Sequence, residues 1–228
     1  MLNLQIKSFL KKQGLDFIHF VDISNLPQKQ NQVFSNALLL GIALSPEFIR
    51  MITEMPDYVD LMVRTGKVNS DEYVEKEAKV DYLADELATF LIEQGYNAYS
   101  QSENNLDKTG FYNTKTKTSP LPHKTIAGLA GLGWIGKHNL LVTPNYGSAI
   151  CMCTVLTDAP LATVSKSPQE SKCGDCSICM EICTPKAIKG NHWKIDGKRE
   201  DLVDVFKCTQ CLKCLVFCPW TQKYAFGQ

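Results

Sequence analysis

The segment that decides the fold reads Cys173-Gly-Asp-Cys176-Ser-Ile-Cys179-Met-Glu-Ile-Cys183, with the spacing C-x2-C-x2-C-x3-C. The same spacing recurs in Cys208-Thr-Gln-Cys211-Leu-Lys-Cys214-Leu-Val-Phe-Cys218-Pro219. Three cysteines spaced in this way can surround one face of an iron–sulfur cube, while the fourth points away and binds the neighbouring cube. The sequence therefore predicts two [4Fe–4S] clusters, with the ligand sets Cys173, Cys176, Cys179, Cys218 and Cys208, Cys211, Cys214, Cys183.

Zinc is the alternative reading of C-x2-C pairs, but a zinc site takes four ligands from separated pairs and not two runs of four. None of the ten cysteines precedes Cys151. Two of them, Cys151 and Cys153, lie outside the repeats and alternate along an expected strand, which places both on one face. We expect these two to be buried structural thiols, with ligation or redox chemistry as the alternative.

The composition is that of a folded chain. It has 228 residues, 44% of them hydrophobic, with 24 basic and 24 acidic side chains, which excludes wholesale disorder. No apolar run approaches the roughly 18 residues of a membrane span, and the N-terminal segment lacks the apolar stretch of a cleavable signal. A cytoplasmic location without membrane association is therefore expected. The absence of net charge argues against a protein that coats nucleic acid.

Residues 1–160 carry the patterns of a layered α/β structure. Apolar spacing predicts helices and turn-bounded apolar runs predict strands. The expected helices are residues 2–13, 56–63, 71–94 and 125–130, and the expected strands are 17–21, 37–44, 96–100, 140–143 and 148–157. Residues 160–171, with their prolines and serines, mark a boundary that predicts domains at 1–160 and 161–228.

The segment 101–122 is polar and shows no periodicity, so we expect a long loop. It carries Lys108, Lys115 and Lys117, and no acid follows Asp107. Loops of this length in compact domains are often functional. Two interpretations stay open, a solvated loop and a segment folded over an anionic ligand.

A glycine-rich segment, Gly131-Leu-Gly-Trp-Ile-Gly-Lys137, precedes the cysteine repeats. Its Gly-x-Gly-x-x-Gly pattern alone is a weak nucleotide-binding signal, because a dinucleotide fingerprint needs a strand before the glycines and a helix after them. Here a helix is expected before them and a strand after them. Nucleotide binding by this segment is therefore not expected.

The stretch from Ala130 to Ser148, with Leu156-Thr-Asp158 and the cysteine repeats behind it, is similar to the epoxyqueuosine reductase family and more remotely to reductive dehalogenases. The resemblance covers residues 117–219, and residues 173–219 also resemble bacterial two-cluster ferredoxins. It implies an α+β protein, with a nitroreductase-like α/β domain that binds cobalamin followed by a ferredoxin-like module. It also implies an iron–sulfur oxidoreductase in which the clusters pass electrons to cobalamin for a reductive reaction.

The resemblance places part of the glycine-rich segment near the corrin ring. The implied contacts are Gly131, Gly133, Trp134, Ile135, Gly136, Lys137 and Asn139. Glycines would let the backbone approach a flat ring closely, and Lys137 could meet its polar side groups. His123 and His138 flank the segment, and one of them could face a ligand.

Two departures from the family concern the substrate. Where the reductases carry an aspartate that donates a proton, this sequence has Lys117, the candidate catalytic residue, and no acid stands between Asp107 and Asp158. The reductases also continue past the clusters into a helical domain that helps hold tRNA, whereas this sequence stops at Gln228. Both departures argue against tRNA as the substrate.

The alternative function is a ferredoxin-like electron-transfer protein that has no catalytic site and serves a partner enzyme. Both interpretations require an electron donor such as a ferredoxin or flavodoxin. The acceptor would be a small molecule in the first and a partner protein in the second.

Overall fold

The computed structural model describes residues 2–194 and 197–227 of the chain. It is a mixed α+β structure with a small sheet, and it divides into two compact units. Unit 1 comprises Met1–Ile42, Lys76–Ala130 and Cys151–Ser167, and unit 2 comprises Ala43–Glu75, Gly131–Ile150 and Pro168–Gln228. The α+β class is thus confirmed, while the predicted domain boundary at residue 160 stays a prediction.

Unit 1 is built around a four-stranded sheet with the order β1-β2-β6-β3. Its strands are β1 (Phe17–Asp22), β2 (Asn36–Ala43), β6 (Ile150–Thr157) and β3 (Ala98–Ser100). β1 pairs antiparallel with β2, and β3 pairs antiparallel with β6. Gly41 of β2 lies opposite Phe17, whose ring occupies the space a Cβ atom would need.

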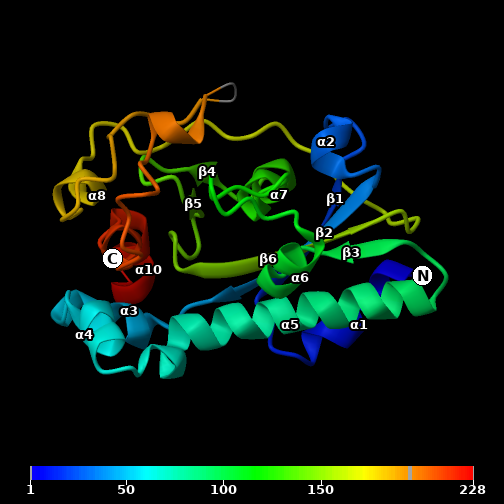
Figure 1. Cartoon of the computed structure of the whole chain (residues 1–228), viewed down its shortest axis with the longest axis horizontal. Coiled ribbons are helices and arrows are strands. Elements are labelled where there is room, and N and C mark those ends of the chain that lie inside the picture. The colour runs from blue at the N-terminus through cyan, green and yellow to red at the C-terminus, as the bar shows by residue number, and fades with distance from the viewer. Residues whose placement is uncertain (1, 195–196, 228) are drawn as a thin grey trace. The chain divides into compact units, whose positions relative to one another are not determined.

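Helices cover both faces of this sheet (Figure 1). The helices of unit 1 are α1 (Leu2–Lys11), α2 (Gln28–Asn31), α5 (Glu72–Glu93), α6 (Glu103–Thr109) and α7 (His123–Ala130). α1 and α5 lie on one side, where Phe9 stacks on Phe90 with ring centroids 6.1 Å apart, and α7 packs on β1 from the other. β2 has both faces covered, so seven of its eight residues are buried.

Unit 2 consists of short elements and turns around the cysteine repeats. It contains α3 (Pro46–Glu54), α4 (Tyr58–Arg64), the 3-10 turn η1 (Val68–Ser70), β4 (Trp134–Ile135), β5 (Leu141–Val142), α8 (Ile178–Glu181), the 3-10 turn η2 (Arg199–Asp201), α9 (Lys213–Val216) and α10 (Pro219–Phe226). β4 and β5 form an antiparallel hairpin, and α10 packs against α3 and α9.

The expected long loop at 101–122 is wrong in part, because α6 occupies Glu103–Thr109. Ser102 caps this helix by accepting a hydrogen bond from the Asn105 N–H at 3.3 Å, and Gly110 ends it in a left-handed conformation with φ of 72°. These are the usual start and stop signals of a helix. The remaining part, from residue 111 to 122, is irregular as expected.

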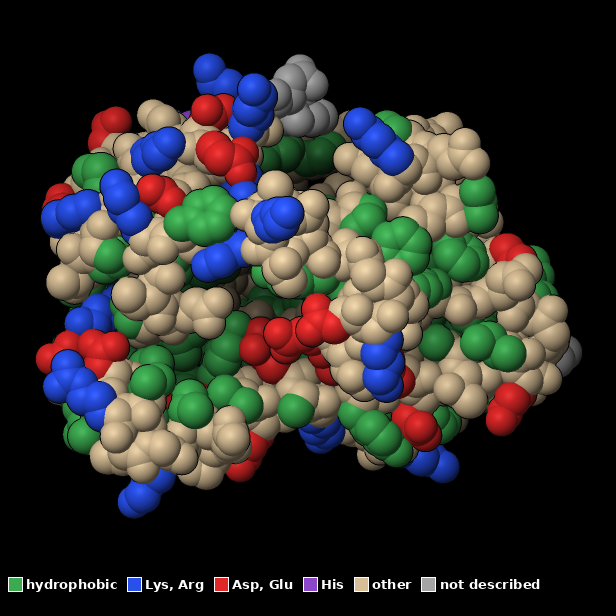
Figure 2. Space-filling model, viewed as in Figure 1, with side chains coloured by type: hydrophobic (Ala, Val, Ile, Leu, Met, Phe, Trp, Pro, Cys, Tyr) green, Lys and Arg blue, Asp and Glu red, His purple; other side chains and the backbone are tan. Residues whose placement is uncertain are grey.

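Charged side chains of both signs lie on the surface. On the face shown in Figure 2, basic and acidic side chains both occur, with several acidic ones gathered near the middle of the view, and the chain has 24 of each charge. Of the helices in the described part of the chain, none has both the length and the apolar character needed to cross a membrane.

Candidate metal centre

The first group of thiols forms around Cys179. Its pKa is raised to about 11, chiefly by burial and then by the nearby thiols Cys173, Cys218 and Cys176. Like charges close together disfavour ionisation, so these three thiols lie near enough to Cys179 to act on its charge. This group, which we name thiol group A, consists of Cys173, Cys176, Cys179 and Cys218.

The second group forms around Cys214. The pKa of Cys214 is raised to about 12, chiefly by burial and then by the nearby thiols Cys208, Cys211, Cys179 and Cys183. Cys214 also packs against a buried cluster that contains Cys179 and Cys183. We name Cys208, Cys211, Cys214 and Cys183 thiol group B, and Cys179 of group A lies next to it.

Each group therefore draws its fourth member from the other repeat, which is the exchange that the spacing predicts. The donor set fits the clusters, since eight thiols in two groups of four are what two [4Fe–4S] clusters require. Across residues 2–194 and 197–227, no three His, Cys, Asp or Glu side chains lie close enough together to hold a single metal ion. Ligation by the eight cysteines stays a prediction.

The two exchanged cysteines are held by backbone N–H groups. Cys218 precedes α10, and the N–H groups of Trp220 and Thr221 donate to its sulfur, which lowers its pKa against the larger raising effect of burial. The Ala187 N–H donates to the Cys183 sulfur at 3.2 Å. Donors of this kind stabilise a thiolate, the form in which cysteine binds metal.

Lys137 connects the glycine-rich segment to thiol group A. Its side chain is buried, at 8% exposure, and its ammonium donates a hydrogen bond to the backbone carbonyl of Cys176 at 3.0 Å. The lysine therefore holds the loop between Cys173 and Cys179. The predicted contact of Lys137 with a corrin stays a prediction.

The glycines of the segment face the β4–β5 hairpin. A Cβ atom on Gly133 would lie 1.9 Å from the Val142 carbonyl oxygen, and one on Gly136 would lie 2.7 Å from the His138 ring. Asn139 has a φ of 66° and donates its N–H to the Gly136 carbonyl at 2.8 Å. Packing within the hairpin is enough to explain why positions 133 and 136 are glycines. Their predicted role at a corrin therefore rests on the resemblance.

His138 is engaged within unit 2. Its Nε2 lies 3.2 Å from the Ser148 hydroxyl, and its Nδ1 accepts a hydrogen bond from the Leu140 N–H at 3.1 Å. Ser148 in turn donates its N–H to the Thr221 hydroxyl at 2.9 Å. This chain of bonds ties the hairpin to α10, which begins at thiol group A.

Trp134 is the largest residue next to thiol group A. It is 1% exposed and packs with Val142 and Cys218, with Cys173 and Trp220 against the same cluster. Its ring meets Trp220 edge to face at 4.8 Å. The indole Nε1 is buried and has no hydrogen-bond partner in the described structure, which costs about 1–3 kcal/mol if it stays unpaired.

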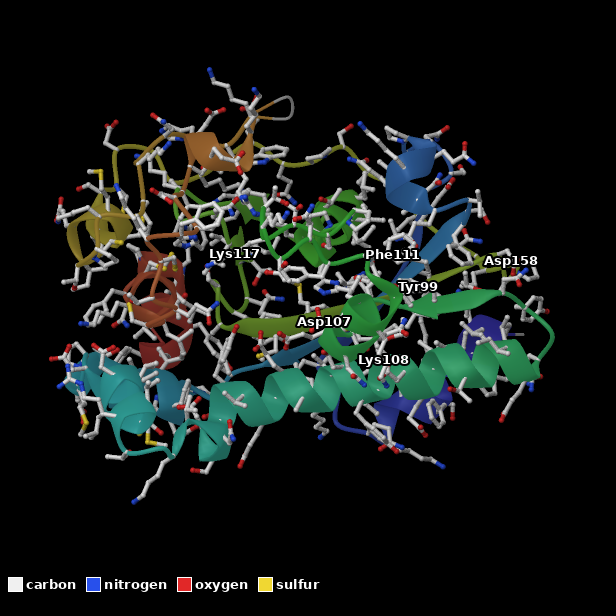
Figure 3. The ribbon with its side chains drawn as sticks, viewed as in Figure 1. Tyr99, Asp107, Lys108, Phe111, Lys117 and Asp158 are labelled. Carbon is white, nitrogen blue, oxygen red and sulfur yellow. The ribbon has the colours of Figure 1, made fainter. Side chains whose placement is uncertain are left out.

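Lys117 lies in a tight turn of unit 1 (Figure 3). Asn113 and Thr118 close the turn with two backbone hydrogen bonds, of 2.8 and 3.3 Å, and Lys117 is exposed with a φ of 52°. The acids on either side in the sequence are also placed on the surface: Asp107 on α6, and Asp158 after β6, where it accepts hydrogen bonds from Asn97. The catalytic role of Lys117 stays a prediction.

The sequence patterns did not predict a polar pair in unit 1, formed by the half-buried Asp81 and the buried Cys153. Burial raises the pKa of Asp81 on α5, and the thiol of Cys153 donates to its carboxylate. The Glu103 N–H donates to the same carboxylate at 2.8 Å. Cys151 and Cys153 are 2% and 0% exposed, which fits the expected buried thiols. The apolar spacing of α5 does not predict this pair, because Asp81 is not one of the apolar positions of the helix.

Comparison with known proteins finds relatives for part of the chain. No family model matches it. It is 30% identical over 133 residues to an epoxyqueuosine reductase of Aliivibrio fischeri, and 33% identical over 122 residues to one of a Synechococcus species. The matches cover 51% and 46% of this chain but 35% and 37% of those relatives. The chain thus spans about a third of the length of the curated relatives it matches.

Solved structures share the fold. A catabolic reductive dehalogenase in complex with 3-bromo-4-hydroxybenzoic acid matches with a TM-score of 0.66 and 19% identity, over 95% of this chain and 31% of the other. An epoxyqueuosine reductase matches with a TM-score of 0.57 and 15% identity, over 99% and 67%. Another reductive dehalogenase, described as acting by B12-dependent dehalogenation, has a TM-score of 0.66 at 17% identity.

Proposed function

We propose that this chain, which is epoxyqueuosine reductase-like and reductive dehalogenase-like, is an iron–sulfur oxidoreductase that supplies electrons for a reductive reaction. The observation that carries the proposal is the exchange of cysteines between the two repeats. Cys173 packs against the buried cluster that contains Cys218, and Cys214 packs against the buried cluster that contains Cys183, each across a repeat boundary. Two separate four-cysteine zinc sites would need no such exchange.

The residues of unit 2 would perform three tasks for the clusters. The thiols of groups A and B would each hold one cluster, which when bound stores one electron at low potential. Backbone N–H groups at Cys183 and Cys218 stabilise the thiolates. The buried side chains of Ile188 and Val203 pack with Cys179 and Cys183, and would limit the access of water to these two sulfurs.

We propose a cobalamin as the electron acceptor. The support is likeness: the fold is shared with a reductive dehalogenase described as B12-dependent, and the curated relatives are epoxyqueuosine reductases. The substrate class stays open, and a cytoplasmic donor such as a ferredoxin or flavodoxin is proposed with it. We do not propose tRNA as the substrate.

The test is anaerobic purification and reconstitution, followed by quantitation of iron, sulfide, zinc and cobalt with cobalamin titrated in. We expect about eight irons and eight sulfides per chain, with cobalamin bound in a one-to-one ratio. A matched control replaces Cys151 by serine, which should leave the iron content unchanged because Cys151 lies outside both thiol groups. Zinc in place of iron would overturn the proposal.

One observation favours the electron-transfer alternative. Gly133, Gly136 and Lys137 are each accounted for by contacts within unit 2, so the glycine-rich segment does not by itself require a corrin. The alternative predicts eight irons, reversible reduction of both clusters and no affinity for cobalamin. The same titration therefore separates the two functions.

A further inference from the structure

The indole N–H of Trp134 is a buried donor without an acceptor. Buried donors in native structures are almost always paired, because an unpaired one loses its bond to water and gains nothing in return. An indole nitrogen can only donate, so its partner must be an acceptor. Within the described residues no protein atom fills that role.

The surroundings of Trp134 indicate what the acceptor is. The side chain packs against Cys218 and Cys173, two of the four members of thiol group A. The Lys172 ammonium lies 5.3 Å from the centre of the Trp134 ring, and the Lys137 ammonium is bonded to the Cys176 carbonyl. The Trp134 N–H and the ammonium groups of Lys172 and Lys137 thus lie near thiol group A, where a cluster with four thiolates would carry negative charge.

We propose that the Trp134 indole N–H donates a hydrogen bond to a sulfur of the cluster held by thiol group A, and that this bond raises the reduction potential of that cluster. The inference rests on the proposed function, since it needs the cluster. Reduction adds negative charge to the sulfurs, and a hydrogen bond to a more negative acceptor is stronger. The donor therefore stabilises the reduced cluster more than the oxidised one.

Thiol group B has a different environment. The nearby Lys213 ammonium donates to the Asp57 carboxylate at 2.7 Å, which balances its charge. Among the described residues, the other buried donor without a partner is Gln32 Nε2, which belongs to unit 1. The Trp134 indole N–H is therefore available to the cluster of group A and not to that of group B. The cluster of group A should have the higher reduction potential and be reduced first.

The first experiment compares reduction potentials of the reconstituted full chain by titration with dithionite, followed by electron paramagnetic resonance. Trp134→Phe keeps an aromatic ring at this position and removes the N–H. We expect one cluster to lose about tenfold in its equilibrium constant for one-electron reduction, a shift of about 59 mV. The other cluster should be unchanged. Trp193→Phe, in the segment between the repeats, is the matched control and should change neither.

A second experiment detects the bond directly. Tryptophan labelled with ¹⁵N in the indole is incorporated, and pulsed resonance measures its coupling to the reduced cluster. The coupling should be present in the wild type, Trp193→Phe and Trp220→Phe proteins and absent from Trp134→Phe. If Trp134→Phe does not fold, persistence of the coupling in the other two variants still assigns it to Trp134.

The outcomes separate this inference from the proposed function. A chain that binds two clusters but shows no indole coupling, or loses its coupling in Trp220→Phe, overturns the role of Trp134 and leaves the clusters in place. Unchanged potentials in a folded Trp134→Phe protein would do the same. A chain that assembles no iron–sulfur cluster overturns both.

Discussion

The ammonium of Lys137 is bonded to the backbone carbonyl of Cys176 at 3.0 Å, although the two residues lie in different segments of the chain. One comes from the glycine-rich segment before β5 and the other from the first cysteine repeat. The bond ties a buried cation to the loop that holds thiol group A. Lys137, which the resemblance predicts to contact a corrin, therefore holds the loop that carries the first cysteines of thiol group A.

The first prediction concerns this bond. Lys137→Met should release iron from one cluster about tenfold faster in the presence of a chelator, because a hydrogen bond from a charged donor contributes about 1.5–3 kcal/mol. The measurement is the time course of iron loss under anaerobic conditions. Lys108→Met is the control, since Lys108 is exposed on α6 in unit 1 and lies outside both thiol groups. Equal rates in both variants would contradict the role of Lys137.

A second prediction tests the exchange of cysteines. Cys218→Ala should abolish the same resonance signal as Cys173→Ala, and Cys183→Ala the same signal as Cys208→Ala. In each variant the iron content should fall from about eight toward four. Loss of the same resonance signal in Cys218→Ala and Cys208→Ala would contradict the prediction, because it would mean that each repeat binds its own cluster.

A third prediction compares two glycines of one motif. A Cβ at position 133 meets the Val142 backbone at 1.9 Å, whereas one at position 136 meets side-chain atoms, of the His138 ring at 2.7 Å and of Val142 at 3.0 Å. Overpacking against a side chain costs about 1–3 kcal/mol, and more when backbone must move. Gly133→Ala should therefore lower the free energy of unfolding by more than 3 kcal/mol and Gly136→Ala by about 1–2 kcal/mol. Anaerobic urea unfolding measures both, and the reverse order would refute the packing argument.

A fourth prediction concerns acid stability. Burial lowers the pKa of His123 to about 4, and burial together with Lys166 and Lys7 lowers that of His19. Between pH 6.5 and about 4 the unfolded chain therefore binds protons that the folded chain rejects, so stability is complete above pH 6.5 and falls below it. For His123 the loss is roughly 3 kcal/mol at most, less because the residue is partly exposed.

The measurement is the unfolding free energy at pH 7.5 and pH 5 for the wild type and His123→Gln. Glutamine can still bond the Thr154 hydroxyl, which lies 2.8 Å from Nδ1 in the wild type. The pH dependence should be smaller in the variant. An identical slope in both proteins would show that His123 is not the group responsible.

Local signals in the sequence predicted much of unit 1. The apolar spacing of residues 71–94 predicts α5, found at Glu72–Glu93, and short apolar runs predict β1 and β2. The apolar spacing does not predict α3 of unit 2, although Ser45 caps this helix and Pro46 occupies its first turn. The polar sequence of α6 predicts a loop, because its seven residues offer no apolar stripe of helical spacing.

The spacing in the sequence predicts which cysteines could form each ligand set, but it does not predict what surrounds them. The spacing of the cysteines is local, and it determines which thiols can meet. The packing of Trp134 on Cys218 and the bond from Lys137 to Cys176 join residues far apart in the chain. No pattern in a single sequence records such contacts, because they depend on how the turns between them close.

The interleaving of the two units constrains how the protein is made. Tyr224 in α10 donates a hydrogen bond from its hydroxyl to the Leu44 carbonyl, and the Ser148 N–H donates one to the Thr221 hydroxyl in the same helix. A nascent chain cannot complete unit 2 until α10 has left the ribosome, and Cys218, a member of thiol group A, immediately precedes that helix. Cluster delivery must therefore follow synthesis of the whole segment from residue 43 to α10. A fragment that carries the cysteine repeats alone would lack Trp134 and Lys137 and should mature poorly.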